Sequence, residues 1–169
     1  VQNLTFITKA QNNKNGPSPD GRGGVLRITF DGGVVDGKGL LGDEDPLNRY
    51  YAYGIRNSFG IGFDALTGNL WETENGRSTD DEINLVLPGF NSGWREVIGF
   101  SNMTSEFNEE NLEDFGGKGT YRDPEFIWRD TIAPTSVLFV HTDKLGSKYK
   151  DNLFVGSVKN GTVFNFPLD

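Results

Sequence analysis

The 169-residue sequence contains no cysteine, which excludes disulfide bonds and thiolate-bound metal sites. It also lacks any apolar run approaching the ~18 residues that a membrane-spanning helix needs. Histidine occurs only once, at His141. General acid–base catalysis by an imidazole within this chain would therefore depend on a single residue.

Positive charge is also in short supply. Lysine and arginine total 16 against 24 aspartate and glutamate residues, which gives a formal net charge of −8 and a pI near 4.7. Proteins that bind nucleic acid need a basic surface to neutralise phosphates, so this balance argues against a nucleic-acid partner. An acidic surface says little more, because acidic surfaces are common among soluble proteins.

Glycine and aromatic residues, by contrast, are plentiful. The 23 glycines and the 12% aromatic content are typical of many short strands joined by tight turns. A turn is expected at 66–68, and the polar segment 100–125 reads as a long loop insertion with one helical turn near 109–114. Strand patterns occur at 23–33, 59–76 (two strands), 82–89, 135–140, 151–161 and 162–169.

A degenerate repeat runs through these strands. The pair Asn-Leu opens a β-run at Asn3-Leu4, Asn69-Leu70 and Asn152-Leu153, and a glycine-bearing turn follows each. Spaced repeats of this kind are a signature of propellers and other repeat architectures. Taken alone, the repeat makes a propeller only somewhat more favoured than a β-sandwich.

Residues 51–94 read "YAYGIRNSFGIGFDALTGNLWETENGRSTDDEINLVLPGFNSGW". This block resembles the signature of the soluble quinoprotein glucose/sorbosone dehydrogenases. The stretch 15–32 resembles the segment before that signature, and 131–140 with 151–164 resembles the blade after it. The resemblance therefore extends over nearly the whole chain, in the family's order.

The resemblance implies an all-β fold, a β-propeller of the six-bladed quinoprotein glucose dehydrogenase type, with about three blades in this chain. We expect one partial propeller domain over residues 1–169. Its approximate blades are 1–45, 46–99 and 126–169, with the loop insertion at 100–125. Because the family's proteins are considerably longer, the chain looks like a fragment. The family's catalytic histidine is expected before Val1, so no catalytic residue is assigned here.

The resemblance also implies pyrroloquinoline quinone (PQQ) and calcium as cofactors and a sugar as substrate. PQQ carries three carboxylates, and a guanidinium offers a planar fork for such groups. The matching residues are Arg56, Asn57, Thr131 and Lys159. Asn57 could donate to a quinone oxygen, and the Lys159 ammonium could pair with a carboxylate or a developing oxyanion. The alternative interpretation of Arg56 and Lys159 is that both are solvated turn residues.

Calcium in this family is held by backbone carbonyls that match Gly76 and Arg77. Carbonyl oxygens are ordinary calcium ligands. The family usually has proline where this chain has Arg77, and this departure weakens the assignment because it adds a positive charge beside a cation. The nearby Asp81 and Glu82 are interpreted mainly as structural turn residues that bond backbone amides.

Other residues depart from the family or match no role in it. Ile55 replaces a histidine that usually precedes Arg-Asn, and Asn75 replaces a histidine or glutamine. His141 matches no catalytic position and is expected past the end of a strand, as a surface residue. The three tryptophans are expected to pack in the core, and Trp128 is the best candidate for stacking on a sugar ring.

Three functions compete. The first is part of a PQQ- and calcium-dependent sugar dehydrogenase that transfers a hydride from a sugar hydroxyl to the quinone. The second is a non-catalytic propeller that acts as a binding module, since fold does not fix function. The third is a truncated fragment without activity of its own, and a homodimer is one way in which its propeller could be completed. Export to the periplasm or the medium is implied by the resemblance only, because no signal peptide is recognised in this sequence.

Overall fold

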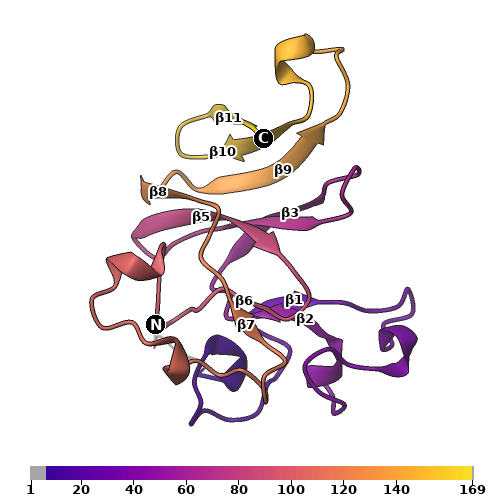
Figure 1. Cartoon of the computed structure of the whole chain (residues 1–169), viewed down its shortest axis with the longest axis vertical. Helices are drawn as coiled ribbons and strands as arrows, with labels where there is room; N and C mark the ends of the chain where they lie inside the picture. Colours follow the sequence, from indigo (N-terminus) through magenta and orange to yellow (C-terminus); the bar gives the residue numbers. More distant parts are fainter. Residues whose placement is uncertain (1–6, 169) are drawn as a thin grey trace. The chain divides into compact units, whose positions relative to one another are not determined.

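The computed structural model describes residues 7–168, which form short strands linked by loops and 3₁₀ turns (Figure 1). The predicted all-β class is confirmed. No helix among the described residues is long and apolar enough to cross a bilayer. The first copy of the Asn-Leu repeat lies outside the described residues. The 3₁₀ turns are Lys9–Gln11, Val35–Gly37, Leu47–Arg49, Ser101–Met103, Glu109–Asn111 and Ser147–Tyr149.

Eleven strands occur in the described part of the chain, and the strand patterns read from the sequence correspond to β1, β3, β4, β5, β9, β10 and β11. The strands are β1 (Gly24–Leu26), β2 (Tyr50–Tyr53), β3 (Ser58–Phe63), β4 (Leu70–Glu74), β5 (Thr79–Val86), β6 (Phe90–Asn91), β7 (Thr120–Tyr121), β8 (Phe126–Asp130), β9 (Pro134–Val140), β10 (Asn152–Ser157) and β11 (Thr162–Pro167).

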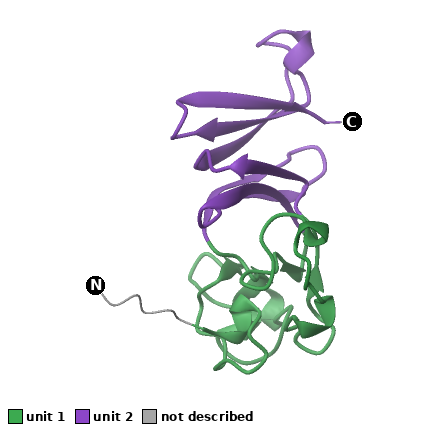
Figure 2. Ribbon diagram, turned by 90° about the vertical axis from the view of Figure 1, so that its left-hand side faces the viewer, with its two compact units in different colours: residues 1–56, 87–123 green, residues 57–86, 124–169 purple. Residues whose placement is uncertain are grey.

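The chain divides into two compact units, each made of two separate stretches (Figure 2). Unit 1 comprises Val1–Arg56 and Leu87–Asp123. Unit 2 comprises Asn57–Val86 and Pro124–Asp169. The chain thus leaves unit 1, forms β3 to β5 of unit 2, returns to unit 1, and finishes in unit 2.

Unit 1 contains one sheet with strand order β1-β2-β6-β7, in which β2–β6 and β6–β7 are parallel pairs. Its core packs Ala10, Leu41, Tyr50 and Tyr53 together. The predicted helical turn near 109–114 is confirmed as the 3₁₀ turn Glu109–Asn111. Sheet membership cuts across the predicted blade ranges, because this sheet takes strands from 1–45, from 46–99 and from the predicted insertion 100–125. The blade boundaries themselves stay a prediction.

Unit 2 contains two antiparallel sheets, β3-β4-β5-β8 and β11-β10-β9. The hairpin of β3 and β4 closes where predicted: the Asp64 N–H donates to the Asn69 carbonyl and the Gly68 N–H donates to the Asp64 carbonyl. Gly68 has φ of +74°, a conformation that glycine adopts without steric cost. The glycine in the predicted turn is therefore explained by its backbone angle.

The two sheets of unit 2 approach closely where β3 meets β9. A Cβ on Gly60 would lie 1.6 Å from the Thr135 carbonyl oxygen, so no side chain fits there. The Thr73 hydroxyl donates to the same carbonyl over 2.6 Å and accepts the Gly60 N–H over 3.0 Å. Behind this contact the core packs Ile83, Val137, Leu153 and Val155 with the rings of Trp71, Trp128, Phe139 and Phe166. The predicted packing role of Trp71 and Trp128 is thereby confirmed.

Strand registers place two groups of loops at opposite ends of unit 2. Ser58 pairs with Glu74, Thr79 with Asp130 and Ser157 with Pro134, so the loops beyond these residues share one end. We call it the Lys159 end, comprising 57, 75–81, 130–134 and 157–160. The other end holds the β3–β4 turn, 64–69, and the loop from 141 to 151. We call it the His141 end.

Candidate functional site

The Lys159 end brings together five of the six residues that the sequence predicted as cofactor or metal contacts: Asn57, Gly76, Arg77, Thr131 and Lys159. They come from four separate loops, and the carboxylate of Asp81 lies among them. The sixth residue, Arg56, belongs to unit 1.

Lys159 and Thr131 are in direct contact. The Lys159 ammonium donates to the Thr131 carbonyl oxygen over 3.0 Å and also contacts the Thr131 hydroxyl. Lys159 is exposed, in the turn after β10, and its backbone N–H donates to the Ile132 carbonyl over 3.2 Å. The ammonium is therefore held over the loop that carries Thr131 rather than extended into solvent, and it remains accessible to an anion.

Asn57 and the turn that follows β4 lie side by side. The Asn57 carbonyl accepts the N–H of Asn75 over 2.9 Å, and the Asn75 amide donates to the Pro134 carbonyl over 3.2 Å. Asn57 and Arg77 are exposed, and Gly76 is half-buried. A Cβ on Gly76 would lie 1.9 Å from the Thr79 carbonyl oxygen, so this tight turn requires glycine. That the carbonyls of Gly76 and Arg77 face a common cavity stays a prediction.

Asp81 has the structural role that the sequence suggested. The Asp81 carboxylate is 1% exposed and accepts three backbone N–H groups, those of Gly76, Ile132 and Ala133. Glu82 lies in β5 rather than in a turn, and its Oε2 accepts from the side-chain amide of Asn84 over 3.2 Å. Asp81 therefore bonds backbone amides as expected, although it lies in β5 rather than in a turn, and the expected bonding of Glu82 to backbone amides stays a prediction.

Arg56 lies in unit 1, where its guanidinium sits 5.6 Å from the ring centroid of Trp94. A guanidinium within ~6 Å of an indole face gains a cation–π attraction. Ile55, which stands where the family has histidine, is 3% exposed and part of the apolar interior. The role of Arg56 at a cofactor stays a prediction.

The donors at the Lys159 end fit an anionic ligand. They are a lysine, an arginine, an amide and a hydroxyl, and the buried carboxylate among them already accepts three N–H groups. Such donors suit the carboxylates and quinone oxygens of PQQ. The fit to calcium is weaker, because residues 7–168 contain no group of three acidic or histidine side chains placed to hold a metal. A calcium ion would depend on backbone carbonyls, which are suitable ligands.

Cavities also occur away from these residues. One in unit 1, of about 390 Å³, is lined by Tyr53, Tyr121, Asn91 and four acidic residues. One in unit 2, of about 570 Å³, lies at the His141 end and is lined by Trp71, Phe126, Phe166 and Asp64 among others. Neither of these two cavities is lined by a residue of the predicted cofactor set.

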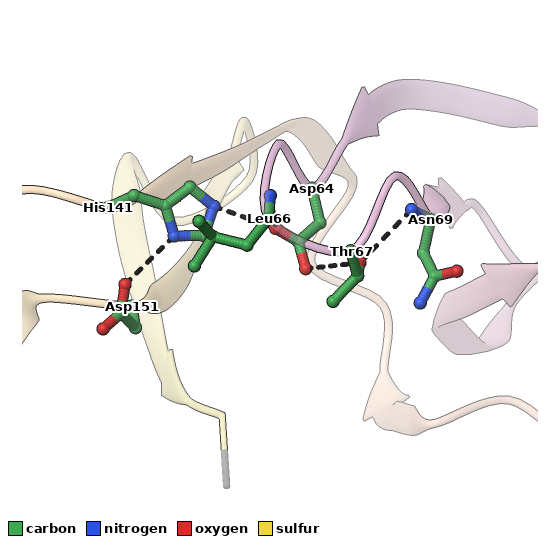
Figure 3. A network of polar contacts seen from close by, with 6 residues as sticks. All are labelled: Asp64, Leu66, Thr67, Asn69, His141 and Asp151. Carbon is green, nitrogen blue, oxygen red and sulfur yellow. Dashed lines mark hydrogen bonds and ion pairs between the residues drawn. The ribbon is translucent and has the colours of Figure 1, made fainter.

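His141 corrects an expectation. It does follow β9, as predicted, but its side chain is only 18% exposed and lies between two carboxylates (Figure 3). Nε2 is 2.9 Å from Asp64 Oδ1 and Nδ1 is 3.1 Å from Asp151 Oδ1. The ring also stacks on Phe139 at an interplanar angle of 9°. The surface assignment was wrong because Asp64, from a loop far away in sequence, and Asp151, at the other end of the same loop, enclose the ring.

Asp64 was missed by the sequence analysis. Its Oδ1 accepts the Leu66 N–H over 2.9 Å and its Oδ2 accepts the Thr67 hydroxyl over 2.7 Å (Figure 3). Burial by itself raises the pKa of Asp64, but these hydrogen bonds and the charge of His141 outweigh it and lower the pKa below its ordinary 3.8. The signal was present in "DALTG", since aspartate often bonds the backbone two residues on.

Comparison with known proteins identifies the relatives of this chain. The family model for glucose/sorbosone dehydrogenase matches residues 5–169. The aldose sugar dehydrogenase YliI of Escherichia coli is 28% identical over 162 residues, covering 94% of this chain and 43% of that protein. Quinoprotein glucose dehydrogenase B of Acinetobacter calcoaceticus is 26% identical over 196 residues, covering 87% of this chain and 40% of that protein.

A solved structure carries the same fold. The PQQ-bound form of the aldose sugar dehydrogenase of Streptomyces coelicolor superposes with a TM-score of 0.62 at 24% identity, over 95% of this chain and 38% of that one. The predicted fold, part of a β-propeller of the quinoprotein glucose dehydrogenase type, is thereby confirmed. The chain spans 35–43% of the length of the curated relatives that it matches.

Proposed function

The chain belongs to the glucose/sorbosone dehydrogenase family, and from this premise we propose that it forms part of a sugar dehydrogenase that uses PQQ and calcium. The reaction is the oxidation of an aldose hydroxyl. Bound PQQ would supply a quinone that accepts the hydride of the sugar. The residues of this chain would bind and orient that cofactor.

Each residue of the Lys159 end has a distinct part in this proposal. Lys159, held by Thr131, pairs its ammonium with a carboxylate or oxygen of the quinone. The Thr131 hydroxyl and the Asn57 amide donate to neighbouring oxygens. Arg56, which belongs to unit 1, is proposed separately as a fork-shaped cation for a carboxylate. The backbone carbonyls of Gly76 and Arg77 would hold calcium, which polarises the reacting carbonyl as a Lewis acid.

No general base is proposed within this chain. His141 is the only histidine, and both of its ring nitrogens face carboxylates at the end of unit 2 opposite Lys159. A base at that end would not reach a substrate held beside Lys159. The proton of the sugar hydroxyl is therefore assigned to no residue described here.

One observation carries the proposal: the contact between Lys159 and Thr131, which are 28 residues apart. The family resemblance assigns both residues to a cofactor site on sequence grounds alone. A random surface lysine would have no reason to be held over that particular threonine. The contact supports a single cofactor-binding surface at the Lys159 end.

The test is a titration of the purified chain with PQQ and calcium, followed by quinone absorbance. Lys159→Ala should raise the PQQ concentration for half-saturation about tenfold, the loss of one charge-assisted contact worth ~1.4 kcal/mol. The matched control is Lys148→Ala, an exposed lysine that lies over the Tyr149 ring. A wild-type chain whose titration shows no change in quinone absorbance would contradict the proposal.

Two observations favour the second candidate, a non-catalytic binding module or an inactive fragment. Ile55 is buried where the family has a polar ring, and Arg77 is exposed where the family has proline. The change at Ile55 removes a polar side chain, and the change at Arg77 removes the rigidity that proline gives to the backbone carbonyl. A chain that binds PQQ without calcium dependence, and without sugar oxidation, would support this candidate over the dehydrogenase.

The proposal extends to partners and location. Phe59, Ile61 and Phe63 are exposed at 67%, 54% and 69%, and they alternate along one face of β3. Exposed apolar rows of this kind mark surfaces that pack against another protein. We expect a second copy of the chain to cover this row in a homodimer, and light scattering that shows only a stable monomer would contradict it. Export to the periplasm or the medium is proposed from the relatives.

A further inference from the structure

Asp81 occupies a place at the Lys159 end that no cofactor contact explains. Its Oδ1 accepts the N–H of Gly76 over 2.8 Å, and its Oδ2 accepts those of Ile132 and Ala133 over 2.6 and 2.8 Å. The side chain is buried within the start of β5. All three donors are main-chain groups, so Asp81 fixes backbone positions rather than side chains.

The backbone that Asp81 fixes belongs to two loops with different expected roles. Gly76 begins the turn that carries the expected calcium carbonyls, and Ile132 follows Thr131 directly. From the other side, the Ser157 hydroxyl and the Lys159 N–H both donate to the Ile132 carbonyl, over 2.6 and 3.2 Å. Asp81 thus joins the turn at Gly76 to the loop that carries Thr131 and is bonded to Lys159.

We propose that Asp81 is a positioning residue that sets the separation between the calcium turn and the PQQ contacts without touching either cofactor. The inference rests on the proposed function of the Lys159 end. A carboxylate suits this task because it only accepts, and it can accept from several N–H groups at once. An asparagine would turn an NH₂ group toward one set of these donors.

The closest matched position in the same unit is Asp64. It is also buried, at 7% exposure against 1% for Asp81, and it also accepts a backbone N–H, from Leu66. It lies at the His141 end, away from all predicted cofactor residues. Its hydrogen bonds join neither the turn at Gly76 nor the loop at Thr131.

The experiment compares Asp81→Asn with Asp64→Asn in the full chain, using two measurements. Amide hydrogen exchange by NMR reports the backbone donors directly. Asp81→Asn should speed exchange at Gly76, Ile132 and Ala133 at least tenfold, and Asp64→Asn should leave those three unchanged. The second measurement is the calcium concentration needed for half-maximal PQQ binding, which should rise at least tenfold in Asp81→Asn and stay constant in Asp64→Asn.

The outcomes separate the inference from the proposed function. Wild-type protein that does not respond to PQQ overturns the proposed function, and the exchange data alone then decide whether Asp81 joins the two loops. Unchanged exchange at the three amides overturns the inference, and so does an equal rise in calcium requirement in both variants. If Asp81→Asn does not fold, Asp81→Glu keeps the acceptor on a longer arm. That variant should raise the calcium requirement, and an unchanged requirement would overturn the inference.

Discussion

The two ends of unit 2 each contain a buried aspartate, but the two carboxylates are paired with different kinds of donor. Asp81 accepts three main-chain N–H groups, which carry no charge and do not titrate. Asp64 accepts one main-chain N–H, a hydroxyl, and a contact from the ring of His141 (Figure 3). The carboxylate at the Lys159 end is therefore held by backbone donors, whereas the carboxylate at the His141 end is held partly by side chains.

The largest expected effect compares the glycines in the two turns. Gly76→Ala should lower the free energy of unfolding by about 3 kcal/mol, because the new methyl group would lie 1.9 Å from a backbone carbonyl that has little room to move. The new methyl group of Gly68→Ala would meet no atom within 4 Å. The free energy of unfolding should therefore fall by only about 1 kcal/mol, which is the cost of placing alanine at a positive φ. Urea denaturation of both variants measures the difference. Equal losses would show that the two turns are equally constrained.

A third buried carboxylate, Glu72 in the middle of β4, extends this comparison because it accepts a hydrogen bond from a side chain. Its Oε1 accepts from the Asn84 amide, and its Oε2 has no partner in the described part of the chain. Burial raises the pKa of Glu72 from an ordinary 4.5 to about 7. Between these values the folded state binds more protons than the unfolded one, so stability falls as pH rises through this window.

Glu72→Gln should remove this dependence. Wild-type protein should lose on the order of 3 kcal/mol between pH 4.5 and 7 through this group, and the variant should not. Thermal or urea unfolding across this pH range measures it. The exposed Glu96→Gln is the control, and it should keep the wild-type slope. A Glu72→Gln variant with the same slope would mean that Glu72 is ionised in the folded protein.

The smallest effect concerns acid stability at the His141 end. The folded pKa of Asp64 lies below the unfolded value of 3.8, so its contribution is present above that pH and is lost as the pH falls below it. Asp64→Asn should therefore lose up to about 1 kcal/mol at pH 6 and become equal to wild type at low pH. Unfolding at pH 6 and pH 2.5 tests this. A variant that is equally destabilised at both values would contradict the pKa argument.

Local patterns predicted much of unit 2, because alternation and glycine turns act over a few residues. The strands β3 to β5 and β9 to β11 and the turn at 66–68 follow from such patterns. β7 did not, since its two residues carry no periodicity and are ordered only by pairing with β6. The position of His141 failed for the same reason, because Asp64 reaches it across the fold rather than along the chain.

The candidate site also combines features that the sequence predicts with features that depend on the fold. Lys159 and Thr131 were assigned to one cofactor site only through the resemblance, because nothing in the residues themselves relates positions 28 apart. Phe139 packs on Trp71 at 5.9 Å between ring centroids. Leu138, its neighbour on the opposite face of β9, is 60% exposed. The alternation of side chains predicts that β9 has two faces, but it does not predict which face packs against the rest of unit 2.

The interleaved course of the chain has a consequence for synthesis on the ribosome. A chain that emerges from its N-terminus releases β3 to β5 before unit 1 has received Leu87–Asp123, and those strands wait for β8 to β11 before unit 2 is complete. Neither unit can finish while only its first stretch is available. Domains that are continuous in sequence fold one after another as they emerge, whereas these two must be completed late. Slow translation through residues 57–123 would prolong the exposure of β3, with its row of Phe59, Ile61 and Phe63, to chaperones and to neighbouring nascent chains.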